Sequence, residues 1–190
     1  MGWLEYLRNR EVGEDTVAEM EKDINRLNTI TDRFSKIGSR PALTPSPVAH
    51  VTRDAVGYLQ ARSPGKIKIS FTAEPATESL SVRLNRPLYE WVIENLVRNA
   101  IDAIEGTGSI QVRVQDTTRR VVVEVEDSGK GISANKQKTI FRPGYTTKNR
   151  GWGLGLSLAR RIIEDYHGGR IFVAHSELGK GSIFRILLNK

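Results

Sequence analysis

Cysteine is absent from the sequence, and so is any apolar run near the roughly 20 residues that a membrane-spanning helix needs. No signal peptide opens the chain. Without cysteine there is no disulfide framework, no thiolate ligand for a metal ion and no cysteine nucleophile. These absences exclude disulfide-rich secreted domains and thiol enzymes, and they predict a cytoplasmic segment that does not itself enter a membrane.

The composition is that of a folded protein with an excess of positive charge. Apolar residues make up 38% and charged residues 27% of 190 residues, which excludes a disordered chain. The net charge of +7 favours an anionic ligand such as a nucleotide, or a partner with an acidic site. Lysine and arginine are scattered beside aspartate and glutamate and form no basic stripe interleaved with aromatics, so nucleic-acid binding is disfavoured.

The sequence divides into a helical part, a linker and a main domain. A single narrow apolar stripe with 3-4 spacing runs through residues 17–37, which favours pairing with a partner helix in a bundle over packing on the helix's own domain. Glycine and prolines then interrupt the pattern. We therefore predict a partial helical hairpin over residues 1–38, a linker over 39–48 and the main domain over 49–190.

The main domain mixes helical and strand periods. Helices are expected over 51–61, 87–104 and 154–166. Strands are expected over 66–71, around Val82, and over 110–114, 121–125, 170–174 and 182–188, with a hairpin between the third and fourth. This order predicts an α+β fold, a two-layer α/β sandwich with a mixed sheet and helices on one face.

Three polar segments interrupt the apolar pattern. Asn95, Asn99 and Asp102 share one face of the predicted helix among apolar neighbours. Buried polar groups need partners, which a metal–phosphate complex could provide. The alternative is that they cap neighbouring loops.

The second segment is Asp127-Ser-Gly129-Lys-Gly131, directly after a strand. A carboxylate at a strand end can accept a hydrogen bond from the amino group of a base, and the glycines let a ligand approach the backbone. In the third, Gly151, Gly153 and Gly155 alternate at the start of a helix after a cationic stretch with Lys148, so free backbone N–H groups could face phosphate oxygens; the alternative is an ordinary glycine-rich loop. The Walker pattern is absent.

Taken together, Asn-x-x-x-Asn-Ala, Asp-x-Gly-x-Gly, Phe-x-Pro with Thr-Thr-Lys, and Gly-x-Gly-x-Gly-Leu resemble, in that order, the GHKL ATP-binding superfamily. The most similar branch is the catalytic domain of bacterial two-component sensor histidine kinases, over about residues 49–190. The resemblance implies the Bergerat fold, ATP and Mg²⁺ as cofactors, and transfer of the γ-phosphate of ATP to a histidine of a dimerisation domain. It also implies signal transduction through a response regulator receiver domain.

The resemblance assigns roles to residues at matching positions. Asn99 would bind Mg²⁺ with support from Asn95, and these two with Lys148 would be the catalytic residues. Asp127 and Ser182 would recognise adenine, with Gly129, Gly131 and Ile132 shaping the base site. The phosphates would be held by Lys148 and the backbone of Gly151, Gly153, Leu154, Gly155 and Leu156. Arg98 and Arg150 would touch phosphates.

Asn95 also separates a kinase from a hydrolase. Gyrase- and MutL-like members have a glutamate four residues before the Mg²⁺ asparagine, where it activates water. Asn95 cannot act as a general base, and Glu94 points about 100° away around the helix. This chain also departs from related kinases at Asp102, where many have lysine, at Gly144-Tyr145, where two aromatics are common, and at Trp152, which replaces a small residue.

No histidine here has the sequence of a phosphoacceptor. Such a histidine is followed by Glu or Asp and then by Thr-Pro or Asn-Pro, whereas His50, His167 and His175 are not. Residues 1–38 are therefore expected to be a dimerisation hairpin that begins downstream of the acceptor, able to form a homodimer through 14–37 but unable to phosphorylate itself. The full-length protein is expected to expose this segment to the cytoplasm, with or without a membrane anchor.

Three alternatives stay open. The first is an ATPase whose nucleotide state drives a conformational clamp. The second is a non-catalytic interaction module that keeps the fold, as in anti-sigma-type regulators. The third is a nucleic-acid binder, which steeply salt-dependent DNA affinity would reveal.

Overall fold

The computed structural model describes residues 41–63, 65–147 and 152–190. The predicted hairpin over 1–38 and the predicted phosphate-binding residues Lys148, Arg150 and Gly151 lie outside these ranges. Among the described residues, no helix combines the length and apolarity needed to cross a membrane.

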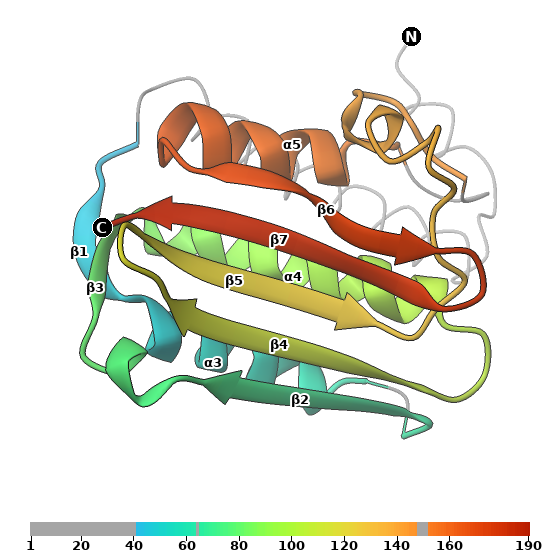
Figure 1. Ribbon diagram of the computed structural model, residues 1–190, viewed down its shortest axis with the longest axis horizontal. Coiled ribbons are helices and arrows are strands. Elements are labelled where there is room, and N and C mark those ends of the chain that lie inside the picture. The colour runs from blue at the N-terminus through green and yellow to red at the C-terminus, as the bar shows by residue number, and fades with distance from the viewer. Residues whose placement is uncertain (1–40, 64, 148–151) are drawn as a thin grey trace, which may run out of the picture. The chain divides into compact units, whose positions relative to one another are not determined.

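A five-stranded mixed sheet organises residues 42–190. Its strand order is β2-β4-β5-β7-β6, with β2 parallel to β4 and all other pairs antiparallel. The strands are β2 (Ile67–Ala73), β4 (Gly108–Asp116), β5 (Arg120–Asp127), β6 (Arg170–Glu177) and β7 (Gly181–Asn189). Helices α3 (Val48–Gln60), α4 (Arg86–Ala103) and α5 (Gly155–Arg161) lie on one face (Figure 1). The predicted sandwich is confirmed.

The core lies between the sheet and the helices. Along β5, Val121, Val123 and Val125 share the face that packs on the helices and are buried, and Val122 and Glu124 on the opposite face are buried as well. Seven apolar side chains of α4 are buried against them and the neighbouring helices: Leu88, Tyr89, Val92, Ile93, Leu96, Val97 and Ala100. The helix begins after Asn85, whose side chain accepts a hydrogen bond from the backbone N–H of Leu88 at 3.3 Å.

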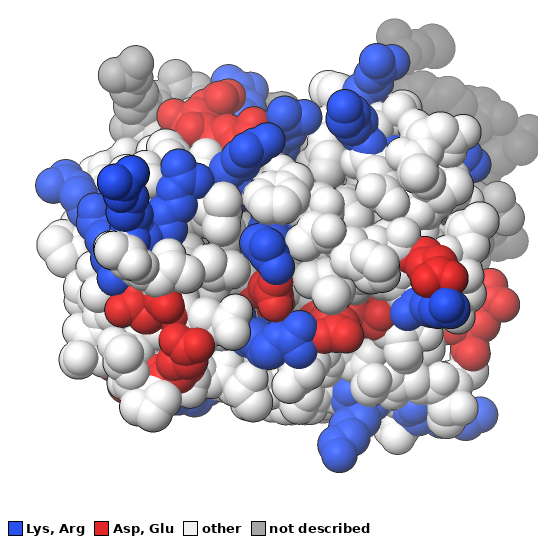
Figure 2. Space-filling model, in the orientation of Figure 1, with Lys and Arg blue, Asp and Glu red and all other residues white. Residues whose placement is uncertain are grey.

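The other face of the sheet carries charged side chains of both signs over its central strands (Figure 2). Glu124 of β5 is buried there because arginines from both neighbouring strands cover it. Arg113 of β4 donates to one of its oxygens at 3.2 Å, and Nε of Arg185 of β7 donates to the other at 2.8 Å. The charge of Glu124 is therefore paired on both sides.

Two local features differ from the sequence expectation. Residues 44–47 lie in the predicted linker, but they form β1 (Thr44–Pro47), which pairs antiparallel with β3 (Ser81–Leu84). The predicted helix over 154–166 is regular only through α5 and then continues as a π-helical segment, Ile162–Tyr166. Short 3₁₀ turns occur at Pro75–Thr77 and Thr139–Phe141.

Candidate functional site

Asp127 ends β5 with a buried carboxyl group that is 5% exposed. Its Oδ1 accepts a hydrogen bond from the N–H of Gly129 at 2.8 Å, and the backbone N–H of Ser182 also donates to the carboxylate. Burial raises the pKa of Asp127 above its ordinary value of 3.8, although these two bonds oppose the shift. An ionised carboxylate offers about four lone-pair positions, so it has acceptor capacity left for a ligand.

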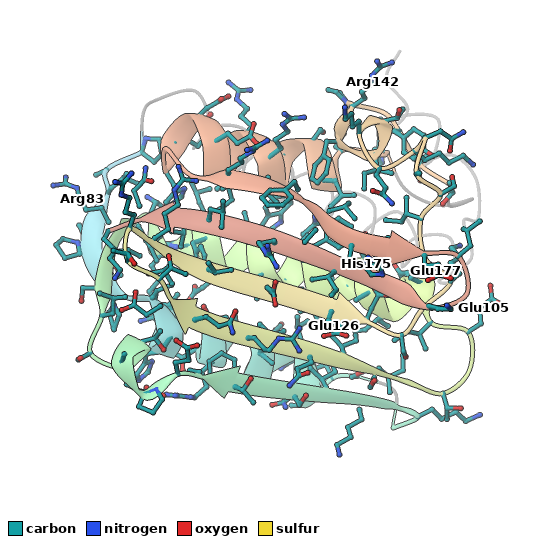
Figure 3. All side chains as sticks on the ribbon, in the orientation of Figure 1. Arg83, Glu105, Glu126, Arg142, His175 and Glu177 are labelled. Carbon is teal, nitrogen blue, oxygen red and sulfur yellow. The ribbon has the colours of Figure 1, made fainter. Side chains whose placement is uncertain are left out.

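The turn after Asp127 runs too close to its neighbours for side chains. A Cβ on Gly129 would lie 2.6 Å from the carbonyl oxygen of Ala103, at the end of α4. Gly131 has a φ of +71°, and a Cβ on it would lie 2.0 Å from the carbonyl oxygen of Glu177, at the end of β6. The two glycines therefore hold the turn between α4 and the β6–β7 connection. Figure 3 places Glu105, Glu126 and Glu177 toward this end of the sheet.

Ser182 lies opposite Asp127 in the register of β7 with β5 and is 4% exposed. Its hydroxyl lies 3.0 Å from that of Ser176 on β6. The hydroxyl of Ser176 also accepts a hydrogen bond from the N–H of Ile132 at 2.7 Å. The structure thus brings together Asp127, Ile132 and Ser182, which the sequence separates by up to 55 residues (from 127 to 182).

Asn99 and Asn95 lie on α4, respectively one and two turns before the end that contacts Gly129. The amide nitrogen Nδ2 of Asn95 is buried and has no hydrogen-bond partner among the residues that the structure describes. Its Oδ1 faces Gly155 so closely that a Cβ there would lie 2.4 Å away. A buried donor without a partner is costly, so the amide fits an acceptor such as a phosphate oxygen.

Asn99 is half-buried, while Arg98 and Asp102 are exposed. An amide oxygen is the type of ligand that Mg²⁺ accepts, so the side chain of Asn99 fits the predicted ion. In the described part of the chain, no group of three or more His, Cys, Asp or Glu could hold a metal.

Between the 3₁₀ turn at 139–141 and α5, a hydrogen bond joins two described residues, Gly144 and Gly153. The N–H of Gly144 donates to the carbonyl of Gly153 at 3.1 Å, and Gly153 has a φ of +64°. Phe141 is buried edge-on against Phe184, with ring centroids 6.3 Å apart. Leu154 and Leu156 are half-buried, whereas Trp152 is 65% exposed. Figure 3 shows Arg142 in this region, on the side of α5.

Three supporting residues were not identified from the sequence. Ser176 and Gln137 hold the backbone of Ile132, with Gln137 Nε2 donating to its carbonyl at 3.3 Å. His167 is buried, and its Nε2 accepts from the N–H of Asn85 at 3.0 Å while Nδ1 donates to the carbonyl of Ile162 at 2.8 Å. Burial lowers the pKa of His167. The imidazole therefore joins the start of α4 to the π-helical segment.

Comparison with known proteins identifies relatives of this domain. The family model described as "Histidine kinase-, DNA gyrase B-, and HSP90-like ATPase" matches residues 84–190. The sensor histidine kinase ZraS of Salmonella typhimurium is 36% identical over 173 residues, covering 89% of this chain and 36% of ZraS. The chain thus spans about a third of the length of that relative.

Solved structures of a histidine kinase have the same fold. The catalytic domain of histidine kinase ThkA matches with a TM-score of 0.70 and 34% identity, over 78% of this chain and 95% of that domain. ThkA crystallised in complex with the response regulator protein TrrA matches with a TM-score of 0.72 and 28% identity, over 100% of this chain and 56% of ThkA.

Proposed function

This chain belongs to the histidine kinase-, DNA gyrase B- and HSP90-like ATPase family, and we propose that it is the catalytic ATP-binding domain of a sensor histidine kinase. It would transfer the γ-phosphate of ATP to a histidine that lies outside this sequence. The observation that carries the proposal is a pair of polar groups, the Asp127 carboxylate near the end of α4 and the Asn95 amide on α4 itself. A buried carboxylate with spare acceptor capacity lies beyond its end, and a buried amide donor without a described partner lies two turns earlier.

One end of this arrangement suits an amino-bearing base. The carboxylate of Asp127 would accept a hydrogen bond from the exocyclic amino group of adenine, and the hydroxyl of Ser182 would bind the same edge. Gly129 and Gly131 would shape the base site by letting the turn pack against the backbone of Ala103 and Glu177, and Ile132 would contact the base. Adenine therefore fits better than a base with a carbonyl at that position, since two acceptors facing each other repel.

The other end suits phosphates. The Nδ2 of Asn95 would donate to a phosphate oxygen, and Asn99 would supply an amide oxygen to Mg²⁺, which neutralises charge on the transferring phosphoryl group when bound. By family resemblance, Lys148 and the backbone of Gly151, Gly153, Leu154, Gly155 and Leu156 would hold the remaining phosphate oxygens. Catalysis would then consist of positioning and charge neutralisation.

The reaction is transfer to an acceptor and not hydrolysis, because Asn95 cannot take a proton from water. Neither nitrogen of His167 is free to act as nucleophile, since one accepts and the other donates a backbone hydrogen bond. The acceptor histidine would lie in the dimerisation helices of the full-length protein, which would also form the homodimer. The complex of ThkA with TrrA supports a response regulator as the next partner. The domain would act in the cytoplasm.

Isothermal titration of Mg-ATP tests the nucleotide site. We expect binding to the unaltered chain and a loss of at least about tenfold in affinity for Asp127→Ala, since a hydrogen bond to a charged group contributes roughly 1.5–3 kcal/mol. Glu126→Ala is the matched control, because this carboxylate is adjacent on β5 but faces the opposite side of the sheet, where it pairs with Arg113. Equal affinity of the two variants would contradict the assignment of Asp127.

Phosphotransfer tests the reaction. Incubation with [γ-³²P]ATP and a separately supplied dimerisation domain from a related kinase should label that domain and leave this chain unlabelled. Steady-state release of phosphate without an acceptor would favour an ATPase clamp. Tight ATP binding with neither transfer nor hydrolysis would favour a non-catalytic interaction module.

A further inference from the structure

Ser176 of β6 contacts two residues of the proposed base site, Ile132 and Ser182, which are far apart in the sequence. Its Oγ accepts the N–H of Ile132 at 2.7 Å, lies 3.0 Å from the carbonyl of Gly181, and lies 3.0 Å from Oγ of Ser182. Gln137 supports the same link by donating Nε2 to the carbonyls of Ile132 and Ser176, both at 3.3 Å. Figure 3 labels His175 and Glu177, the sequence neighbours of Ser176, at the end of β6.

The three bonds of Ser176 determine where the proton of Ser182 points. A serine hydroxyl donates one hydrogen bond and accepts two. The carbonyl of Gly181 can only accept, so the single proton of Ser176 is donated there, and the N–H of Ile132 occupies one acceptor position. The second acceptor position of Ser176 is then filled by the hydroxyl of Ser182, and all three bonds form together only if Ser182 is the donor.

Ser182 therefore has no proton left for a ligand and can only accept. Its neighbour across the strands, Asp127, is an acceptor as well when ionised. Both groups that face the base are consequently acceptors. At the 6-position such a pair matches the amino group of a 6-aminopurine, which has two N–H donors, and rejects the carbonyl oxygen of a 6-oxopurine.

We propose that Ser176 is a positioning residue that orients the Ser182 hydroxyl as an acceptor and so contributes to the selection of 6-aminopurine over 6-oxopurine nucleotides. The inference rests on the proposed nucleotide function. Ser176 itself does not touch the base. Without the hydroxyl of Ser176, the hydroxyl of Ser182 is free to rotate and can donate to the carbonyl of an oxopurine.

Titration of Mg-ATP and Mg-ITP tests the inference, because the two nucleotides differ only in the 6-substituent of the purine and in the proton that the oxo form carries on N1. The unaltered chain should prefer ATP by roughly tenfold or more, as a site built to bind an amino group rejects an analogue without it. Ser176→Ala should reduce that preference by about three- to tenfold, the effect of one redirected hydrogen bond. Ser176→Thr keeps the hydroxyl on a β-branched residue suited to a strand and should keep the preference.

A role in the fold alone predicts a different result. Ser176→Ala would then weaken ATP and ITP equally, or change only the melting temperature, and the inference would be wrong. Ser70→Ala is the matched control, since Ser70 also lies on a strand and donates to a backbone carbonyl, that of Ile110, but on the other face of the sheet. It should leave the preference unchanged.

Two further outcomes separate the inference from the proposed function. If the unaltered chain binds ATP and ITP equally, ATP binding stands and the role of Ser176 is wrong. If it binds neither, the proposed function fails and the inference fails with it. Should Ser176→Ala not fold, Ser182→Ala must lower the preference by itself, and an unchanged ratio in that variant would overturn the inference.

Discussion

Alanine in place of Gly155 is expected to disturb the phosphate end of the site through Asn95. The added Cβ would lie 2.4 Å from Oδ1 of Asn95 and 3.1 Å from its Cγ, whereas real Cβ contacts are essentially never below 3.0 Å. The amide must therefore move or rotate, and its Nδ2 loses the position from which it would bind a phosphate. Gly155 has an ordinary φ, so the effect comes from this contact and not from the backbone conformation.

The size of the effect follows from the two interactions involved. Overpacking a well-filled site typically costs 1–3 kcal/mol, and each kcal/mol lowers the melting temperature by about 2–4 °C in a domain of this size. Loss of one charge-assisted hydrogen bond to phosphate, roughly 1.5–3 kcal/mol, lowers the affinity for Mg-ATP by about 10- to 100-fold. We expect both losses in Gly155→Ala.

Gly57→Ala is a control in which the same substitution causes no clash, because Gly57 is inside α3 and a Cβ there meets nothing within 4 Å. It should stabilise the domain by about 0.5–1 kcal/mol through helix propensity and leave nucleotide affinity unchanged. In an Asn95→Ala background the side chain that clashes is gone, so Gly155→Ala should cost little further stability. Calorimetric unfolding and titration of all variants give the comparison. Unchanged stability and affinity in Gly155→Ala would refute the reasoning.

Three further predictions concern buried polar groups. Tyr89 and Thr52 bond through their hydroxyls at 2.7 Å, so Tyr89→Phe or Thr52→Val should each cost about 1–3 kcal/mol in denaturant unfolding, and the double variant less than their sum. The lowered pKa of His167 means that the unfolded chain binds this proton more readily; stability should therefore fall as pH drops below about 6.5, and His167→Gln should flatten that dependence in unfolding at pH 5–8. Because the pKa of Asp127 is raised, its carboxylate takes up a proton at a pH above the ordinary value of 3.8 as the solution is acidified. ATP affinity should therefore fall as pH drops toward that raised pKa, and Asp127→Asn should not show this pH-dependent fall in titrations.

Elements with strong local periodicity were predictable from the sequence. The valine-rich run of 121–125, in which every residue is buried, predicted a strand, and the apolar stripe of 87–104 matched the helical period. Pairing between distant strands was not predictable, because no local pattern in residues 67–73 indicates that they lie parallel to β4. The strand at 44–47 was hidden by Pro45 and Pro47, which normally indicate a break, although prolines are tolerated at a sheet edge.

The motif residues of the site were accessible to sequence reasoning, whereas the residues that support them were not. Simple alternation from the buried Ile171 would turn His175 inward and Ser176 outward. A register shift between Val173 and His175 reverses this, so that Ser176 pairs with Ser182. A bulge of this kind cannot be recognised until the partner strand is known.

The position of β7 sets the order in which the domain can be completed. β7 follows the other four strands of the sheet in sequence, yet it lies between β5 and β6. During synthesis β5 keeps an open edge, and β6 has no strand to join, until β7 leaves the ribosome. Asp127 and Ser182 face each other only across β5 and β7. A nascent chain therefore completes its base site last, after the helices and the β4–β5 hairpin have had time to fold.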